Sequence, residues 1–203
     1  MKKTLILSLL IVIALIGIQC SIYQTMVNLS RLQFKLGDVN SFSLMNIPIS
    51  NKTSISDFSA LDVINITSSV SEGKFPVSFI LNVNAKNPND GTGGYTRTDA
   101  TLKDFAWTLE LDGKKTISGR LDNSVSVPGT GDITVIPLRM DIDLKEFFAE
   151  RGYESLINLA LALGGTQGSS SKVALYAKPT VSTVLGDISY PGELKIVDTQ
   201  FSN

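Results

Sequence analysis

The chain has 203 residues, with 18 Lys and Arg against 19 Asp and Glu, one Cys and no His. Without His there is no Ser-His or Cys-His nucleophile pair and no His-bearing zinc site, and one Cys excludes internal disulfides and iron-sulfur clusters. The formal net charge of -1 gives no electrostatic basis for nucleic-acid binding, and the length suits one domain.

The N-terminus has the composition of an export signal. Lys2 and Lys3 precede an apolar segment over residues 5–18, interrupted only by Ser8 and Gly17. This segment is shorter than the roughly 20 residues that a helix needs to cross a bilayer, and it falls in the range of signal peptides. We therefore expect a signal peptide over residues 1–19.

Cys20 follows directly, where a lipoprotein signal carries its lipidated residue. Gly17 and Gln19 depart from the usual lipobox, which has Leu three residues before Cys and a small residue just before it. No small-x-small cleavage site follows the apolar segment. We expect lipid attachment at Cys20, with an uncleaved anchor or ordinary cleavage as the alternatives. Each of the three places the body outside the cytoplasm.

Residues 20–30 would then form a tether. Loss of Lys2 and Lys3 with the signal takes the 18 basic residues to 16 against 19 acidic ones, a net charge of -3. A mildly acidic body is held at a membrane by its N-terminus rather than by surface charge.

Alternation of apolar and polar residues predicts strands along the body. Residues 31–36 begin a strand that continues past a bulge at Gly37-Asp38 to Pro48. The strongest pattern covers residues 75–86 and ends at Asn87-Pro88-Asn89. Further strands are expected at 101–111, 114–121, 124–127, 133–142, 172–184 and 193–197. Asp112-Gly113 indicates a hairpin turn, and Pro137 indicates an edge strand or a bulge.

Two segments have helical spacing. Residues 54–70 place Phe58, Leu61 and Ile64 on one face, with Ser56 suited to the N-cap. The alternative for this segment is a strand that includes Val63, Ile64 and Ile66. Residues 144–163 form the stronger helix, with a break or kink expected at Gly152. Together these elements predict a mainly β (α+β) fold: an antiparallel β-sandwich with two helical insertions, formed by residues 31–203 as a single domain.

The order of several motifs resembles the late embryogenesis abundant (LEA) type 2 family, also called the water stress and hypersensitive response (WHy) domain. These motifs are the strand Phe75-Pro76-Val77-Ser78-Phe79-Ile80-Leu81-Asn82-Val83 with its Asn87-Pro88-Asn89 ending, then Leu109-Glu110-Leu111-Asp112-Gly113, Ile117-Ser118-Gly119, Val127-Pro128-Gly129-Thr130-Gly131 and Ile136-Pro137-Leu138. The bacterial lipoprotein members are the most similar. The resemblance implies an immunoglobulin-like or fibronectin-like β-sandwich without catalytic residues.

Few residues are candidates for chemistry. Asn87, Pro88 and Asn89 are expected to end a strand and to bond loop amides, although their amides could also bind a partner. Asp141 and Asp143 could hold a cation with one more ligand, but Asp143 at a helix N-cap is favoured. Ser71 and Lys74 match a Ser-x-x-Lys spacing without its companion motifs, so we expect them to lie in a solvated loop. We expect no metal site and no cofactor.

The helix at 144–163 carries Phe147, Phe148, Leu156 and Leu163 as a possible apolar ligand or partner face. We expect it to pack on the sandwich, with a lid over an apolar cavity and a face offered to a partner or membrane as alternatives. An apolar cavity of at least about 300 Å³ beneath it would favour a carrier.

The first functional hypothesis is a non-enzymatic cell-envelope protein, membrane-tethered as a periplasmic or outer-membrane lipoprotein, whose domain binds an envelope protein or protects surfaces under stress. The alternative is a carrier of an apolar or lipid-like ligand held between the 144–163 helix and the sandwich. Enzyme activity ranks third, because no carboxylate pair stands out as acid and base.

Overall fold

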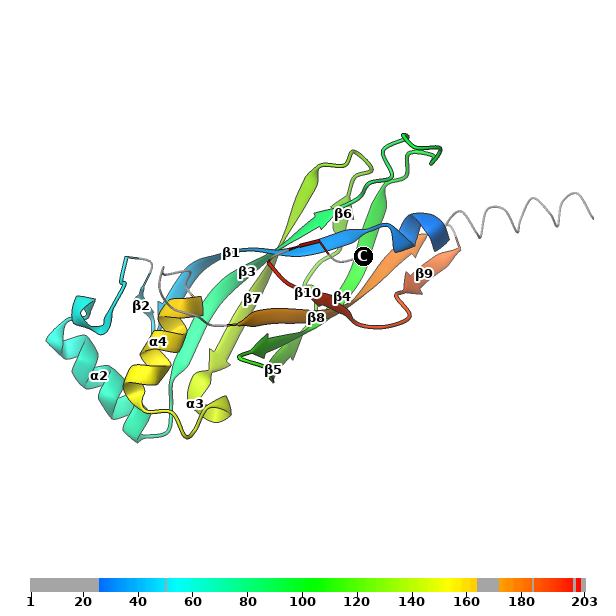
Figure 1. The fold of residues 1–203 in the computed structure, drawn as a ribbon. Helices are drawn as coiled ribbons and strands as arrows, with labels where there is room; N and C mark the ends of the chain where they lie inside the picture. Colours follow the sequence, from blue (N-terminus) through cyan, green and yellow to red (C-terminus); the bar gives the residue numbers. More distant parts are fainter. Residues whose placement is uncertain (1–25, 50, 164–171, 184, 199, 202–203) are drawn as a thin grey trace, which may run out of the picture.

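Strands are the main secondary structure of the body. The computed structural model describes residues 26–49, 51–163, 172–183, 185–198 and 200–201. All strand pairs within this part of the chain are antiparallel, and they form two sheets (Figure 1). Alternating polarity gives each strand one face for the core and one for solvent. The predicted antiparallel β-sandwich with helical insertions is confirmed.

The first sheet has four strands in the order β2-β1-β3-β7. Their bounds are Gln33–Leu44 (β1), Ile47–Pro48 (β2), Pro76–Lys86 (β3) and Ile133–Asp143 (β7). Buried and outward residues alternate along the whole of β3, as its sequence predicts. β1 pairs with β3 through two register shifts, and the first, after Leu36, is the irregularity expected at Gly37-Asp38.

The second sheet has the order β10-β8-β4-β5, with β6 paired to β4 and β9 to β8. The bounds are Ala100–Leu111 (β4), Lys114–Gly119 (β5), Val125–Val127 (β6), Val173–Thr183 (β8), Gly186–Ser189 (β9) and Leu194–Ile196 (β10). Asp112 and Gly113 both have positive φ in the β4–β5 turn, as a tight hairpin requires. β9 is absent from the expected strands because its four residues show no apolar alternation.

The two sheets meet across a core of aromatic and aliphatic side chains. Phe34 of β1 and Phe105 of β4 are both 0% exposed, and their ring centroids lie 5.4 Å apart. At one edge of the sandwich, the Leu36 N–H donates to the Val197 carbonyl at 3.0 Å and joins the sheets. The opposite edge is formed by β5 and β7, which belong to different sheets, and we call it the open edge. Pro137 lies on this edge, as expected for a strand proline.

The first helix differs from the prediction. A 3-10 turn, η1 (Ile55–Asp57), precedes α2 (Ala60–Ser71). The N-cap of α2 is Ser59 rather than Ser56, because Ser59 and Asp62 form a capping box in which each side chain accepts from the other's backbone N–H at 3.1 Å.

The predicted buried face of α2 was also partly wrong. Phe58, which precedes the helix, and Ile66 are buried, but Leu61 and Ile64 are 67% and 64% exposed. Leu61 and Ile64 share one face of the helix, as their spacing predicts, but that face is turned to solvent, and Ile66 on the other side of the helix packs in the core. The outward face of α2 therefore carries two large apolar side chains.

The second helical segment is divided in two, as Gly152 predicts. α3 (Leu144–Phe147) follows β7 directly, and α4 (Tyr153–Leu163) follows a short irregular connection. Asp143 is the N-cap of α3, where its Oδ1 accepts from the Lys145 N–H at 2.9 Å. α4 contacts α2 and η1.

The molecule is elongated, and its ends differ. Residues 26–30 are helical and lie at one end of the long axis, whereas α2 and α4 lie side by side at the other (Figure 1). Within the described residues, no helix is both long enough and apolar enough to cross a bilayer.

Candidate functional site

The Asn87-Pro88-Asn89 corner follows β3 at the end of the sandwich where residues 26–30 lie. Both asparagines are buried, at 0% and 2% exposure, although asparagine is usually a surface residue. Pro88 holds Asn87 in an extended conformation and ends the ladder, because proline has no N–H to donate. The corner therefore places two carboxamides inside the protein, where each polar atom needs a partner.

The Asn87 side chain joins the two sheets. Its Nδ2 donates to the carbonyls of Thr98 and Val127, both at 2.9 Å, just before β4 and at the end of β6. Its Oδ1 accepts from the backbone N–H and the Nδ2 of Asn89, at 3.2 and 2.9 Å. A carboxamide has two donors and two acceptor positions, so Asn87 uses all four. The residue after β3 is thereby bonded to the segment before β4 and to the end of β6 in the other sheet.

Asn89 extends this network to the N-terminal segment. Its Nδ2 also donates to the Asn28 carbonyl at 2.8 Å, and the Asn28 side chain donates to Thr98 Oγ1 at 3.0 Å. Tyr190 Oη donates to the Leu29 carbonyl at 2.6 Å, and the Leu29 side chain is buried. The described part of the expected tether, residues 26–30, is thus docked on the sandwich.

Arg31 covers this network. Its Nη2 donates to the Pro88 carbonyl at 3.4 Å, and its guanidinium lies 3.7 Å from the ring centroid of Tyr95. Three buried polar atoms nearby have no hydrogen-bond partner within the described part of the chain: Asn28 Oδ1, Asn89 Oδ1 and Arg31 Nη1. We call the set Asn28, Leu29, Arg31, Asn87, Asn89 and Tyr190 the N-terminal junction.

Gly129 beside the junction and Tyr190 within it are both adapted to it. Gly129 lies so close to the carbonyls of Asn89 and Thr98 that a Cβ would overlap both, which explains why glycine follows Pro128. Burial raises the pKa of the Tyr190 phenol well above its ordinary value of 10.0, so its hydroxyl stays protonated and donates to Leu29.

The sequence pattern does not show that residues 28 and 29 belong to this network. The bonds that hold them come from Asn89 and Tyr190, 61 and 161 residues away along the chain. One local feature points to a docked segment. Asn28 and Leu29 lead directly into an alternating strand, and no Pro, Gly or charge cluster between them and the strand marks a linker.

The apolar residues of the second helical segment lie in the core. Phe148, Leu156 and Leu163 are buried, at 4%, 0% and 3% exposure, and Phe147 is half-buried. The Lys114 ammonium donates to the Phe147 carbonyl and ties α3 to the start of β5. The packing of these side chains is that of a helix buried on the body.

The two Asp candidates have separate partners. Asp143 Oδ1 accepts from the N–H groups of Phe75 and Lys145, at 2.8 and 2.9 Å, so it is a helix cap as expected. Asp141 lies 3.4 Å from Arg139 Nε. The described residues contain no group of three or more His, Cys, Asp or Glu arranged to hold a metal ion.

Ser71 and Lys74 do not form a nucleophile pair. The Ser71 hydroxyl donates to the Thr67 carbonyl at 2.9 Å at the end of α2, and Lys74 is exposed in the loop before β3. Cys20 and the signal peptide expected over residues 1–19 lie outside the described residues.

No family model matches the chain, and no curated protein matches it. Two solved structures align with it. A crystal structure of a protein from Archaeoglobus fulgidus is 12% identical with a TM-score of 0.32, and the alignment covers 59% of this chain and 82% of that one. A solution structure of a protein from Arabidopsis thaliana is 16% identical with a TM-score of 0.31, over 82% of this chain and 80% of that one. At these scores neither alignment assigns a family.

Replacement of Asn87 by Ala is expected to lower the free energy of unfolding by about 2 to 4 kcal/mol, because it leaves the buried Thr98 and Val127 carbonyls without donors. Denaturant unfolding followed by circular dichroism measures the loss. Asn82→Ala, on the half-buried outer side of β3, is the matched control and should change stability by less than about 1 kcal/mol. Equal effects of the two substitutions would contradict the assigned role of Asn87.

The raised pKa of Tyr190 predicts a loss of stability at alkaline pH. The folded-state pKa is raised, so the unfolded chain ionises first, and the stabilisation that is complete below pH 10.0 falls as the pH rises above that value. Unfolding measured between neutral and strongly alkaline pH should show a shallower loss for Tyr190→Phe than for the parent. Tyr176→Phe, on the half-buried outer side of β8, is the control. A parallel pH profile for Tyr190→Phe and the parent would sink this assignment.

Proposed function

We propose that the chain is a membrane-tethered, non-enzymatic binding domain of the bacterial cell envelope, a lipoprotein-like member of the LEA type 2 (WHy) family. The observation that carries the proposal is the N-terminal junction, which bonds the segment after the expected anchor into the sandwich. The order of the sequence motifs, including Asn87-Pro88-Asn89, supports the family. The sandwich topology agrees with the fold that this family implies.

The junction supports a tether that orients the domain as well as retaining it. Asn28 is eight residues from Cys20, and eight residues span at most about 29 Å when fully extended. A lipid on Cys20 would keep the junction within that distance of the bilayer. Because α2 and α4 lie at the other end of the long axis, they would project away from the membrane (Figure 1).

The far end has the surface of a binding element. Leu61 and Ile64 are exposed there on α2, and the one charged residue of this helix, Asp62, is used in its capping box. A helix face without charge and with exposed apolar side chains is typical of surfaces that contact other proteins. We therefore propose an envelope protein as the partner. The family resemblance is the ground for expecting this binding to strengthen under osmotic or similar stress.

The chemistry of the polar groups supports a non-enzymatic role. The sequence has no His, and the carboxyls of Asp57, Asp62, Asp90 and Asp104 have pKa values lowered by the hydrogen bonds they accept. Asp57 and Asp90 accept from backbone N–H groups of their own turns, and Asp62 accepts from the Ser59 N–H in the capping box. Asp104 accepts mainly from Arg120. A general acid at neutral pH needs the opposite shift.

Replacement of Cys20 by Ser should release or mislocalise the body, because the expected lipid is attached there. Membrane fractionation measures the release, and intact mass spectrometry of the extracted parent should give a chain that begins at Cys20 with added acyl mass. Ser21→Ala is the neighbouring control and should stay in the membrane fraction. A parent species that begins at Met1 without acyl mass would contradict the lipoprotein assignment.

A photo-crosslinking residue at Leu61 should form adducts with envelope proteins in cells, and more of them after osmotic shock. The control position is Asp38, which is exposed on β1 away from α2. Adducts are measured by gel shift and mass spectrometry. Equal labelling at the two positions, with no change on shock, would argue against a partner at the far end.

A further inference from the structure

Large apolar side chains are exposed at both ends of the molecule. Within the described residues there are six: Met26, Leu61, Ile64, Ile133, Val135 and Leu185. Leu61 and Ile64 belong to α2 and to the proposed partner surface at the far end. The other four, which are between 47% and 56% exposed, are carried by three segments that meet at the end of the N-terminal junction. We call these four side chains the junction-end surface.

Two of the three segments adjoin the junction directly. Met26 is two residues before Asn28, in the same helical segment. Ile133 begins β7, opposite the last residue of β3, and Val135 is the next outward residue on that strand. β3 leads directly into the Asn87-Pro88-Asn89 corner, so β7 starts at the same end of the sandwich as the junction.

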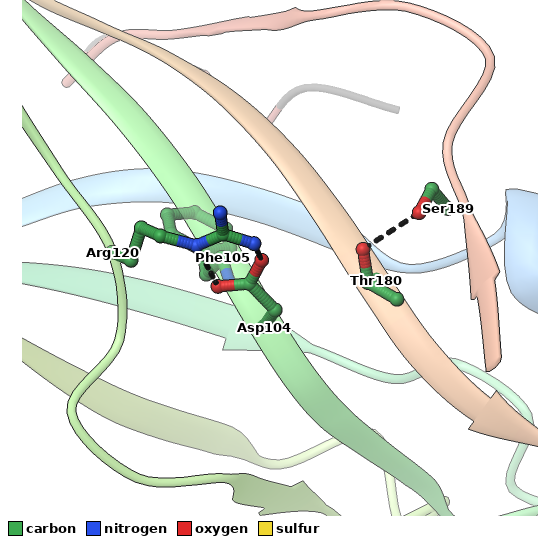
Figure 2. A network of polar contacts seen from close by, with 5 residues as sticks. All are labelled: Asp104, Phe105, Arg120, Thr180 and Ser189. Atoms are coloured by element: carbon green, nitrogen blue, oxygen red, sulfur yellow. Dashed lines mark hydrogen bonds and ion pairs between the residues drawn. The ribbon is translucent and has the colours of Figure 1, made fainter.

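The turn between β8 and β9 brings Leu185 to this end as well. β8 is antiparallel to β4, and its last residues pair with the start of β4, so the turn lies at the same end as residues 26–30 (Figure 1). Hydroxyl groups hold the turn together. Thr180 Oγ1 and Ser189 Oγ are 2.8 Å apart across the two strands (Figure 2), and Thr183 Oγ1 donates to the Gly186 carbonyl at 2.7 Å.

Leu185 is an unusual residue for a turn. Turns are built mainly from Gly, Pro, Asn, Asp and Ser, whereas the sequence here is Thr183-Val184-Leu185-Gly186. Leu185 is 48% exposed, so about half of its side chain gains nothing from burial in the fold. Exposed apolar side chains that gather at one end of a protein are typical of contacts with other proteins or with membranes.

The charges at this end do not favour an anionic partner. The segments that surround the surface, residues 26–31, 86–99, 128–135 and 183–187, contain three basic residues and four acidic ones: Arg31, Lys86, Arg97, Asp90, Asp99, Asp132 and Asp187. The excess of basic residues that draws a protein to anionic lipids is therefore missing from these segments. A contact made here depends on the apolar side chains and is insensitive to the charge of the lipid.

The proposed anchor places a bilayer next to this surface. Met26 is six residues from Cys20, and six residues span at most about 22 Å. A short connection of this kind gives two linked groups an effective concentration of about millimolar. A contact too weak to bind a free protein to lipid is therefore formed when the protein is tethered.

We propose that the junction-end surface rests on the bilayer, with Leu185 and Met26 inserted among the lipid headgroups and with Ile133 and Val135 beside them. The inference rests on the proposed function, because it needs the N-terminal anchor. An anchor alone leaves the domain free to rotate about its connection. The second contact limits this rotation and keeps α2 turned away from the membrane.

Tryptophan substitution with lipid quenchers tests the surface. Leu185→Trp is compared with the matched control Leu61→Trp, because both leucines are exposed and they lie at opposite ends of the molecule. Each full-length variant is purified in detergent and reconstituted into phosphatidylcholine vesicles whose acyl chains carry bromine, which quenches tryptophan emission. The parent, whose only Trp is the buried Trp107, supplies the baseline.

Flotation of the vesicles before the measurement establishes that the protein is membrane-bound. We expect the added emission of Leu185→Trp to be quenched at least about threefold more than that of Leu61→Trp, and equally with and without phosphatidylglycerol. Equal quenching at the two positions in floated protein would overturn the membrane contact and leave the tether intact. Protein that does not float with the vesicles would overturn the tether and the contact together.

A charged residue on β7 gives an independent test. In the Leu185→Trp protein, Ile133→Asp should reduce the quenching at least about twofold, because a carboxylate resists transfer from water into a bilayer. Leu61→Asp in the same protein is the control and should leave the quenching unchanged. Both substitutions are at exposed positions, and circular dichroism establishes that each variant is folded. Equal quenching in the two variants would show that the assigned surface is wrong.

Discussion

The carboxamide of Asn87 is the interaction on which the sandwich end depends. One neutral group bonds a carbonyl at the end of β6 and another just before β4 and, through its oxygen, fixes Asn89 of the same corner. Asn89 then holds Asn28, so the pairing of the sheets and the docking of the N-terminal segment share a single network. The core between Phe34 and Phe105 supplies burial, but apolar contact does not specify which strand ends meet.

A neutral amide suits this position better than an ion pair. Taking two charges out of water costs several kcal/mol for each ion, and their attraction often fails to recover it. A carboxamide with all four of its positions bonded has a much smaller desolvation cost and keeps directional bonds. The charged residues of the chain are instead placed at surfaces, as the Arg120–Asp104 and Arg139–Asp141 pairs are at the open edge.

Much of this architecture follows from local sequence. The alternation in β3, the Asp112-Gly113 turn, the edge position of Pro137 and the break before Gly152 each depend on a few neighbouring residues, and all were predictable. The error in α2 has a local cause as well. The segment offers three serines, at 54, 56 and 59, as possible caps, and only the pairing with Asp62 selects the last of them.

The candidate sites were harder to predict from the sequence, because their residues are far apart along the chain. Nothing near residue 28 in the sequence indicates its contact with Asn89. The junction-end surface combines Met26, which precedes β1, with Ile133 and Val135 on β7 of the first sheet and Leu185 in a turn of the second. Only the relative placement of the two sheets brings these side chains to the same end.

The bond from Tyr190 to Leu29 has a mechanical consequence. A force applied through the N-terminus reaches the chain at residues 28 and 29 before it reaches β1. It is then divided between Asn89, at the end of β3, and Tyr190, after β9, which belong to opposite sheets. Tension is therefore shared by both layers, and the first strand is shielded from being peeled away on its own.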